Sequence, residues 1–334
     1  MRVAINGMGR IGRCVIRILR DVEDIDLVAI NDPGDHEQLV HLLRYDSTHG
    51  IADGVKHQDG VLRFGRHVVK MLAQRNPADL PWSDLGIDLV IEVSGHFTKR
   101  ELAIGHCHAG AKRVLVGAPC ADADKTVVFG VNHTELRGDE KVISSASCTT
   151  NCLAPIVAAL DEHYALTGGV MTTIHAVTND QHLLDLPHSK DFRRARSAFT
   201  NIIPTSTGAA RALQLVFPDA TWAIDGLSMR VPVIDVSTVD LVVRTEKQPD
   251  ASAVIELFRD LASRRAYSGA LAVCADERVS SDFLGHPASS IVDLPLTSVG
   301  SDGLLRVVSW YDNEWGFSSR VVDLIRYLRG MEAA

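Results

Sequence analysis

Three glycines near the amino terminus constrain the fold of this chain more than any other feature. Gly7, Gly9 and Gly12 form the pattern G-x-G-x-x-G between a short apolar run and a segment of helical period. Glycine at these places permits a tight turn, lets a phosphate group approach the backbone and lets the helix pack closely on the strand. The free N–H groups at the start of that helix add positive potential. The pattern therefore predicts a dinucleotide-binding βαβ unit and, with it, a parallel sheet.

The elements after the glycine motif alternate as a parallel sheet requires. Strands are predicted at residues 3–6, 26–31, 88–93 and 113–117, and helices at residues 10–22 and 35–45. Asp32 closes the second strand, twenty residues after Gly12, where a carboxylate accepts hydrogen bonds from an adenosine ribose. The alternative for Asp32 is a cap of the helix that follows Pro33. A carboxylate at this place also disfavours a 2′-phosphate, which favours NAD over NADP.

Beyond about Ser147 the predicted strands become longer and richer in threonine and valine. They span residues 169–177, 227–231, 236–246 and 304–310, and an amphipathic helix follows at residues 315–329. Such strands favour a mixed, largely antiparallel sheet. We therefore predict an α/β Rossmann dinucleotide-binding domain at residues 1–147, completed by the C-terminal helix within residues 314–334, and an α+β catalytic domain at residues 148–313.

Composition excludes several classes of protein. The 334 residues carry 34 lysines and arginines against 42 acidic residues, a net charge of −8, which favours no nucleic-acid partner. The six scattered cysteines do not form the pattern of a disulfide scaffold and fit a reducing cytoplasm. No apolar stretch approaches about 20 residues, and no signal peptide fits before Gly7, so neither a membrane span nor secretion is expected.

Cys148 is the candidate nucleophile. It precedes a run of helical period, so we predict it at a helix N-terminus, where the dipole and unpaired amides stabilise a thiolate. His175 shares a strand face with Met171 and Thr173, and so need not point into the apolar layer. The two residues would form a Cys-His arrangement. Alternatively, Cys148 is a packing residue, or it forms a disulfide or metal pair with Cys152.

Two further sets of polar residues indicate anion recognition. Thr205, Thr207 and Gly208 precede a predicted helix at residues 209–216, which suits a phosphate and equally a plain helix cap. The candidate phosphate clamps, which alternatively form solvated ion pairs, are Arg193, Arg194, Arg196 and Arg230.

The run His106-Cys107-His108 suggests a metal site as one interpretation. Residues two apart on a helix point in different directions, so we interpret these as ordinary surface and core positions.

Several motifs together resemble those of the phosphorylating glyceraldehyde-3-phosphate dehydrogenase family along nearly the whole chain. They are INGMGRIGR at residues 5–13, YDSTHG at 45–50, ASCTTNC at 146–152, NIIPTSTGAA at 201–210, MRVP at 229–232 and DNEWG at 312–316. The resemblance implies NAD-dependent oxidative phosphorylation of D-glyceraldehyde 3-phosphate to 1,3-bisphosphoglycerate, a glycolytic and gluconeogenic reaction. It further implies that Cys148 forms a thiohemiacetal and then a thioester, with His175 as the base and as a stabiliser of the oxyanion.

The same resemblance implies the binding residues and the assembly. The substrate and inorganic phosphate would be held by Ser147, Thr149, Thr178, Asp180, Arg194, Thr207, Gly208 and Arg230. The dinucleotide would be held by Asn6, Gly7, Gly9, Arg10, Ile11, Gly12, Asp32 and Asn313. The implied assembly is a homotetramer, in which the segment from about Thr178 to Asn201 reaches toward the neighbouring subunit's cofactor site. No metal is implied.

The resemblance leaves two alternatives for the function. Erythrose-4-phosphate dehydrogenase shares the glycine loop, the cysteine and the histidine, whereas the intact Thr207-Gly208 loop favours the triose phosphate. An NAD-binding interaction protein without turnover is disfavoured because Cys148 and His175 are both present. The departures from the family pattern, which concern cofactor affinity more than the reaction, are Met8, Val93, Gly117 and Phe317.

Overall fold

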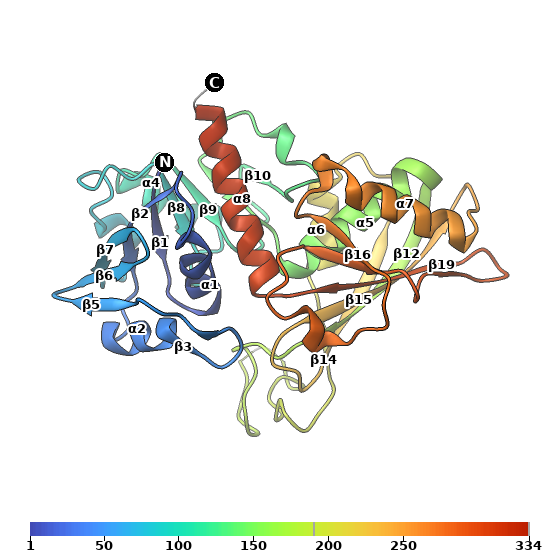
Figure 1. The fold of residues 1–334 in the computed structure, drawn as a ribbon, viewed down its shortest axis with the longest axis horizontal. Helices are drawn as coiled ribbons and strands as arrows, with labels where there is room; N and C mark the ends of the chain where they lie inside the picture. Colours follow the sequence, from blue (N-terminus) through green and yellow to red (C-terminus); the bar gives the residue numbers. More distant parts are fainter. Residues whose placement is uncertain (190, 333–334) are drawn as a thin grey trace. The chain divides into compact units, whose positions relative to one another are not determined.

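The computed structural model describes residues 1–189 and 191–332. The chain divides into two compact units. The first comprises Met1–Ser147 together with Ser318–Ala334, and the second comprises Cys148–Phe317. Figure 1 traces the chain through both units, from blue at the amino terminus to red at the carboxyl terminus.

Within the described residues, a nine-stranded sheet forms the centre of the first unit, in the order β10-β11-β9-β8-β1-β2-β7-β6-β5. The strands from β10 to β7 pair in parallel, and β6 and β5 continue the sheet antiparallel at one edge. Their bounds are β1 Arg2–Asn6, β2 Asp26–Asn31, β5 Lys56–Gln58, β6 Val61–Phe64, β7 His67–Leu72, β8 Leu89–Glu92, β9 Arg113–Val116, β10 Lys125–Thr126 and β11 Val142–Ser144. A separate pair is formed by β3 Tyr45–Asp46 and β4 Gly50–Ile51.

Short helices connect these strands. α1, Arg10–Leu19, joins β1 to β2; α2, His36–Arg44, follows β2; α3, Arg100–Ala103, and α4, Gly105–His108, lie between β8 and β9. The expected helix over residues 10–22 ends early, because the Val22 N–H bonds the Leu19 carbonyl in a tighter turn. Trp82, Val90 and Val114 belong to one buried cluster between α3, α4 and the sheet.

The helix α8, Trp315–Glu332, ends the described chain, and its residues from Ser318 on belong to the first unit. Tyr327 packs its ring edge-on against His133 with centroids 4.9 Å apart. Arg326 and Arg329 both pair with Asp24 at 3.4 Å. The carboxyl-terminal helix therefore contacts two separate parts of the amino-terminal sequence.

A mixed eight-stranded sheet forms the second unit in the described part of the chain, in the order β13-β14-β12-β15-β19-β17-β16 with β18 on β19. β12 and β14 are parallel, as are β16 and β17, and the other pairs are antiparallel. The bounds are β12 Leu166–His175, β13 Ile203–Ser206, β14 Ile224–Arg230, β15 Ser237–Thr245, β16 Leu271–Cys274, β17 Ser290–Asp293, β18 Ser298–Val299 and β19 Leu305–Tyr311. A Rossmann unit and an α+β unit with a largely antiparallel sheet are thus confirmed.

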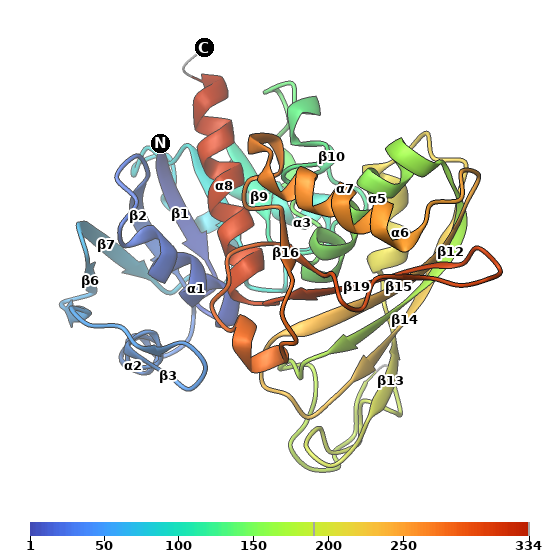
Figure 2. The same cartoon turned by 45° about the vertical axis from the view of Figure 1, so that its right-hand side comes forward.

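Three helices cover one face of this second sheet (Figure 2). They are α5, Cys148–Tyr164, α6, Ala209–Val216, and α7, Ala251–Ser263. α5 packs on β12, β15, β17 and β19, and so brings its first turn beside the central strands. None of the helices formed by the described residues combines the length and apolar character that a bilayer crossing requires.

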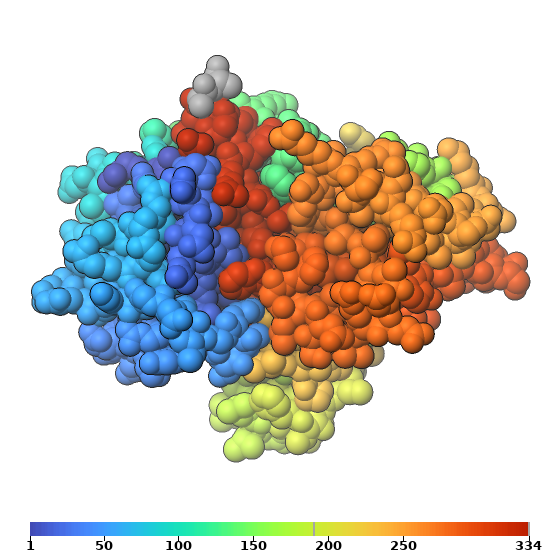
Figure 3. All heavy atoms as spheres, viewed as in Figure 1, coloured from blue at the N-terminus to red at the C-terminus, as the bar shows by residue number. Residues whose placement is uncertain are grey.

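The segment between β12 and β13 forms no regular helix or strand over residues 176–189 and 191–202. It stands out from the rest of the second unit as a yellow-green projection in Figure 3. Several of its large apolar side chains are exposed, among them Leu183, Leu184, Phe192, Phe199 and Ile202. Phe192 is 94% exposed, which a single folded chain rarely leaves uncovered.

Candidate functional site

The glycine motif forms a cradle between β1 and α1 in the first unit. Gly7 has a φ of +106°, and a Cβ placed there would lie 2.5 Å from the Ser94 backbone nitrogen. A Cβ on Gly12 would lie 2.1 Å from the Gly7 carbonyl oxygen. At both positions a side chain would collide with a backbone atom, so only glycine fits. Gly9 has no atom within 4 Å of its Cβ position and lies open at the helix N-terminus.

A cavity of about 430 Å³ opens beside this cradle. It is lined by Asn6, Gly7, Gly9, Asn31, Asp32, Pro33, Gln74, Arg75, Val93, Ser94, His96 and Phe97. These residues follow the carboxyl ends of neighbouring parallel strands, where α/β sheets bind their ligands. Its size and its mixture of backbone amides, polar groups and one aromatic ring suit part of a dinucleotide.

Asp32 is half-buried on the wall of this cavity. Its carboxylate accepts hydrogen bonds from the Met8 and Gly34 N–H groups, each at 2.8 Å. The helix α2 is capped instead by Asp35, whose side chain accepts from the Gln38 N–H. The alternative interpretation of Asp32 as the helix cap is therefore wrong, and Asp32 ties the glycine turn to the end of β2.

Arg10, at the start of α1, forms a two-pronged pair with Asp46, at 2.5 Å and 3.1 Å. Burial alone would raise the pKa of Asp46, but hydrogen bonds from Arg10 and from the His49 and Thr48 N–H groups lower that pKa well below its ordinary value. Ile11 is half-buried next to Arg10 on the same turn. Arg10 is thus held by Asp46 at the amino end of the helix.

The second unit brings Cys148 and His175 together. Cys148 is the first residue of α5, and its Sγ lies 3.6 Å from His175 Nε2. His175 ends β12 and is only 5% exposed. The distance permits a thiol and an imidazole to exchange a proton directly.

Strand register explains the position of His175. β12 and β14 pair in parallel with His175 opposite Arg230, and Arg230 NH1 lies 2.7 Å from His175 Nδ1. Met171, Thr173 and His175 form the buried face of β12, while Val170 is 59% exposed on the other face. The expectation that His175 avoids the packed layer is therefore wrong, because α5 covers the face that carries the histidine.

Burial and a neighbouring cation keep the imidazole neutral. Burial and Arg230 together lower the pKa of His175 to about 3, and the Ala176 carbonyl opposes this only weakly. Burial raises the pKa of the Cys148 thiol, although Arg230 and hydrogen bonds from Thr149 act in the other direction. Both shifts favour a thiol beside a neutral imidazole over a preformed ion pair.

Cys152 lies one turn further along α5 and is fully buried. Its Sγ contacts Ser290 Oγ at 3.7 Å, and burial raises the pKa of its thiol to about 12. Cys148 and Cys152 do not form a disulfide. Of the two thiols, only Cys148 is partly exposed and has a histidine at its sulfur.

The predicted substrate residues fall into two groups in the second unit. Asp180 pairs with Arg194 on the projecting segment, and both act electrostatically on Arg230, which makes one charged cluster near His175. Thr178 bonds to Gln181 next to this cluster. By contrast, Arg193 is exposed, and Arg196 forms an exposed pair with Asp185, so these two arginines are not part of it.

Thr207 and Gly208 form the amino end of α6. Gly208 is the N-cap residue, and Thr207 Oγ1 accepts a hydrogen bond from the Ala209 N–H at 3.2 Å. Asn313 follows β19 and is 6% exposed, with its side-chain oxygen accepting from Ser237 Oγ at 2.7 Å. Ser147 is half-buried immediately before Cys148.

Comparison with known proteins decides the family. Residues 147–313 match the family described as glyceraldehyde 3-phosphate dehydrogenase, C-terminal domain, and residues 1–100 match its NAD binding domain. The chain belongs to the glyceraldehyde-3-phosphate dehydrogenase family. It is an NAD-dependent oxidoreductase, as the resemblance predicted.

Similar proteins of this family match nearly the whole chain. Glyceraldehyde-3-phosphate dehydrogenase A, chloroplastic, of Zea mays is 49% identical over 97% of this chain and 81% of its own length. Glyceraldehyde-3-phosphate dehydrogenase of Streptomyces coelicolor is 47% identical over 97% of both chains. The protein of the same name from Borreliella burgdorferi is 48% identical over 98% of this chain and 99% of its own.

One functional neighbour of the site in this family member was missed by sequence reasoning. The Tyr311 hydroxyl lies 2.9 Å from Thr149 Oγ1 and 2.8 Å from Thr173 Oγ1, behind the Cys148 turn. Tyr311 is 1% exposed and ends β19. The only signal in the sequence was a tyrosine at the end of a largely apolar run. That signal did not reveal its partners Thr149 and Thr173.

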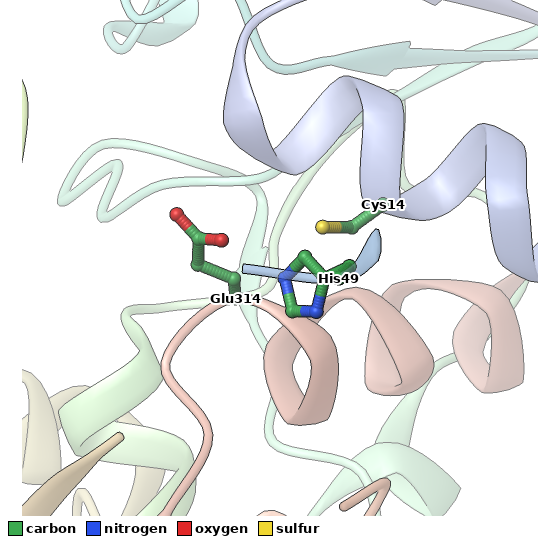
Figure 4. Close-up of side chains that lie close together, drawn as sticks. All are labelled: Cys14, His49 and Glu314. Atoms are coloured by element: carbon green, nitrogen blue, oxygen red, sulfur yellow. The ribbon is translucent and has the colours of Figure 1, made fainter. Parts of the chain in front are cut away.

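Cys14 on α1 and His49 between β3 and β4 also lie close together in the first unit (Figure 4). The Cys14 sulfur and a ring nitrogen of His49 are within 4.8 Å of each other. Two such ligands are fewer than the three or four that protein zinc sites supply. Glu314, which the figure also draws, belongs to the second unit, and we assign no metal to this family member.

Proposed function

We propose that this chain oxidises D-glyceraldehyde 3-phosphate to 1,3-bisphosphoglycerate with NAD and inorganic phosphate. The observation that carries the proposal is the 3.6 Å approach of Cys148 Sγ to His175 Nε2 at the start of α5. The names of the relatives, glyceraldehyde-3-phosphate dehydrogenases at 47–49% identity, support the same substrate.

In the proposed first step, Cys148 attacks the aldehyde carbon. His175 is neutral. For Nε2 to accept the thiol proton, the ring hydrogen must be on Nδ1, which then donates to the Ala176 carbonyl at 2.7 Å, while the neighbouring Arg230 NH1 donates to that same carbonyl at 3.1 Å. The sulfur bonds to the carbonyl carbon while the carbonyl π electrons move to the oxygen. The resulting thiohemiacetal oxyanion is stabilised by the protonated imidazole and by the Cys148 N–H at the helix N-terminus.

The second step leaves an acyl group on the sulfur. NAD, when bound, accepts the hydride from the former aldehyde carbon. The imidazolium first returns its proton to the oxyanion, which gives the thiohemiacetal hydroxyl, and His175 takes that proton back as the thioester carbonyl forms on Cys148. An oxygen of inorganic phosphate then attacks the thioester carbonyl carbon, the C–S bond breaks, and the electron pair returns to the Cys148 sulfur. The product is the acyl phosphate, the proton of the hydrogen phosphate passes to solvent, and the thiolate recovers a proton from the imidazolium.

We assign the substrate's own phosphate to the cluster of Arg230, Arg194, Asp180 and Thr178. Arg230 is half-buried, and burial lowers its pKa, so an anion at this place would compensate a partly desolvated guanidinium. We assign inorganic phosphate to Thr207, Gly208, Ser147 and Thr149. Because the Thr149 hydroxyl is engaged with Tyr311, its contribution there is its backbone N–H.

We assign the dinucleotide to the cradle and cavity of the first unit. Gly7, Gly9 and Gly12 admit the pyrophosphate, with Arg10 and Ile11 on the first turn of α1, and Asp32 binds the adenosine ribose. The Asn6 side chain is engaged by Glu92 and Asn31, so its part is to shape the cavity wall. Asn313, held by Ser237, is assigned to the nicotinamide carboxamide.

We further propose a homotetramer. The support is the projecting segment of the second unit, where Leu184 is 78% and Phe192 94% exposed. Apolar side chains of this size on the surface favour burial against another copy of the chain. Phe192→Ser is expected to lower the mass measured by light scattering after gel filtration, and a tetramer of unchanged stability would contradict the assignment.

We also propose a cytoplasmic location. All six cysteines lie within the described residues and none forms a disulfide, which suits a reducing compartment. Recovery of the protein in an oxidised, membrane-bound or secreted fraction would contradict this proposal.

The decisive experiment is NADH formation by the purified protein with glyceraldehyde 3-phosphate or erythrose 4-phosphate, each with and without inorganic phosphate. Cys148→Ser is expected to abolish turnover, because a serine hydroxyl lacks the acidity and nucleophilicity of the thiol. Cys274→Ser is the matched control: Cys274 Sγ donates to the Asp276 carbonyl at 3.1 Å in the same unit, and serine keeps that donor.

Phosphate-dependent turnover of the triose, lost in Cys148→Ser and retained in Cys274→Ser, is the expected result. Faster turnover of the tetrose would show that erythrose 4-phosphate is the preferred substrate. Turnover indifferent to phosphate would overturn the acyl-phosphate step, and turnover that survives Cys148→Ser would overturn the nucleophile.

A further inference from the structure

A chain of buried hydrogen bonds runs from the core of the first unit to the wall of the cavity. Its centre is Glu92, the last residue of β8, which is 1% exposed. One carboxylate oxygen accepts from the Ser94 N–H at 2.8 Å and from Ser94 Oγ at 2.6 Å. The other accepts from Asn6 Nδ2 at 2.5 Å and lies 3.0 Å from His106 Nε2. A buried carboxylate requires such a full set of donors.

Trp82 fixes the tautomer of His106. The indole Nε1–H can only donate, and it donates to His106 Nδ1 at 3.0 Å. Nδ1 must therefore carry a lone pair, and the ring hydrogen must be on Nε2, which points at Glu92. His106 is fully buried on α4, so water offers no alternative partner. The imidazole is a neutral donor of defined direction.

The other end of the network forms the cavity wall. Asn6 Oδ1 accepts from Asn31 Nδ2 at 2.7 Å, and Asn31 Oδ1 accepts from the Gln74 N–H at 2.8 Å. Asn6, Asn31, Gln74 and Ser94 all line the cavity. Ser94 is also the residue whose backbone lies 2.5 Å from the Cβ position of Gly7. The donors that hold Glu92 thus fix the wall and the glycine turn together.

We propose that His106 is a positioning residue of the cofactor site, which acts by holding Glu92 where its carboxylate orders Asn6 and Ser94. The inference rests on the proposed placement of NAD in this cavity. If His106 is removed, Glu92 loses one of its four donors and is left with an undercompensated oxygen. The carboxylate then shifts or recruits water, and the two side chains that it orders on the cavity wall move with it.

The test compares His106→Leu with His106→Gln by titrating NAD into the protein and measuring the dissociation constant calorimetrically. Leucine fills the site without a donor, whereas the glutamine amide can reach Glu92 from a similar place. We expect His106→Leu to weaken NAD binding about tenfold, as the loss of one hydrogen bond to a charged group implies. His106→Gln is expected to bind within about threefold of the unaltered protein. The KM for the aldehyde is expected to stay within twofold in both.

His67 provides the matched control. It is buried in the same unit with the same tautomer, since Nδ1 accepts from the Leu27 N–H and Nε2 lies 2.8 Å from the Leu19 carbonyl. It is the first residue of β7, at the other end of this strand from Gln74, which lines the cavity. His67→Leu is expected to lower the unfolding temperature without changing NAD affinity. An equal loss of NAD affinity in both leucine variants would show general loosening and overturn the proposal.

A spectroscopic measurement separates positioning from packing. In a spectrum of protein labelled at histidine nitrogen, the resonances lost in His106→Gln identify His106, and they are expected to show the pattern of an Nε2–H tautomer. Trp82→Phe keeps an aromatic ring but removes the indole donor, so His106 is expected to lose its fixed tautomer, with weaker NAD binding.

The NAD titrations and the spectra do not depend on turnover. If His106→Leu does not fold, Trp82→Phe and Glu92→Gln replace it, and wild-type NAD affinity in both would overturn the proposal. Wild-type affinity in a folded His106→Leu would do the same. A protein that binds NAD with this dependence on His106 but fails to oxidise the triose phosphate would refute the proposed function alone.

Discussion

Alanine at Gly12 is expected to damage the first unit through one close contact. The new Cβ would lie 2.1 Å from the Gly7 carbonyl oxygen, more than 1 Å inside van der Waals contact, and 3.5 Å from Val93 Cγ2. Since the Gly7 carbonyl is a backbone group, α1 has to move away from the end of β1. Overpacking costs about 1–3 kcal/mol, and an approach of 2.1 Å to a backbone oxygen belongs in the upper part of that range, about 2–3 kcal/mol. Alanine recovers up to about 1 kcal/mol of helix propensity, which leaves a net loss of about 1–2 kcal/mol.

The assays are thermal unfolding and NAD titration of Gly12→Ala. A loss of about 1–2 kcal/mol lowers the midpoint of a unit of this size by roughly 2–8 °C. The shift of the helix N-terminus away from the cradle is expected to weaken NAD binding at least tenfold, because the amides that would face the pyrophosphate move with it.

Gly9→Ala is the matched control for Gly12→Ala. Gly9 precedes α1 with a φ of −71° and has no atom within 4 Å of its Cβ position, so alanine fits there. Its cost is limited to the weaker N-cap preference of alanine, at most about 1 kcal/mol. If Gly12→Ala unfolds at the same temperature as Gly9→Ala, close packing of helix and strand is not the reason for the glycine.

Three further predictions concern reactivity, pH and the hydroxyl network. Iodoacetamide at pH 8 is expected to label Cys148 and not the buried Cys152, whose pKa is raised to about 12, and peptide mapping that finds Cys152 labelled in folded protein would contradict this. The pKa of Asp46 is lowered by Arg10, so the stability that the pair adds is present above the unfolded pKa of about 4 and is lost as pH falls through the folded pKa. The urea midpoint of Asp46→Asn should therefore fall less steeply than that of the unaltered protein as the pH is lowered from 6 to 2. Parallel curves for the two proteins would refute the role of this pair. Tyr311→Phe is expected to cost about 1–3 kcal/mol of unfolding free energy, because two buried hydroxyls lose a partner, and an unchanged urea midpoint would contradict it.

The sequence was most informative where local signals agreed. The strand at residues 26–31 and the helix at residues 209–216 are observed with the predicted bounds, since each is a periodic run between clear turn signals. The hairpin of β5 and β6 was not predicted, because β5 consists of three polar residues and β6 is only four residues long. The family and both classes of sheet were predicted from motifs and strand character.

The candidate site was less accessible to sequence reasoning where partners are distant in the chain. Cys148 and His175 were named from motif and spacing, but the register that places Arg230 beside His175 joins strands 55 residues apart. His106 was interpreted as an ordinary position because only its neighbours Cys107 and His108 were considered. Glu92 was the available signal, since a charged residue ends an otherwise apolar buried strand and must find donors.

The discontinuous first unit has a consequence for the order of folding during synthesis. Its last helix begins at residue 315, so α8 leaves the ribosome only after the entire second unit has been made. Until then, His133 lacks the Tyr327 ring and Asp24 lacks its two arginines. While the second unit is being made, the nascent amino-terminal unit therefore exposes the apolar surface that α8 later covers. Truncation of the last fifteen to twenty residues would leave the nucleotide-binding half, rather than the catalytic half, unfinished.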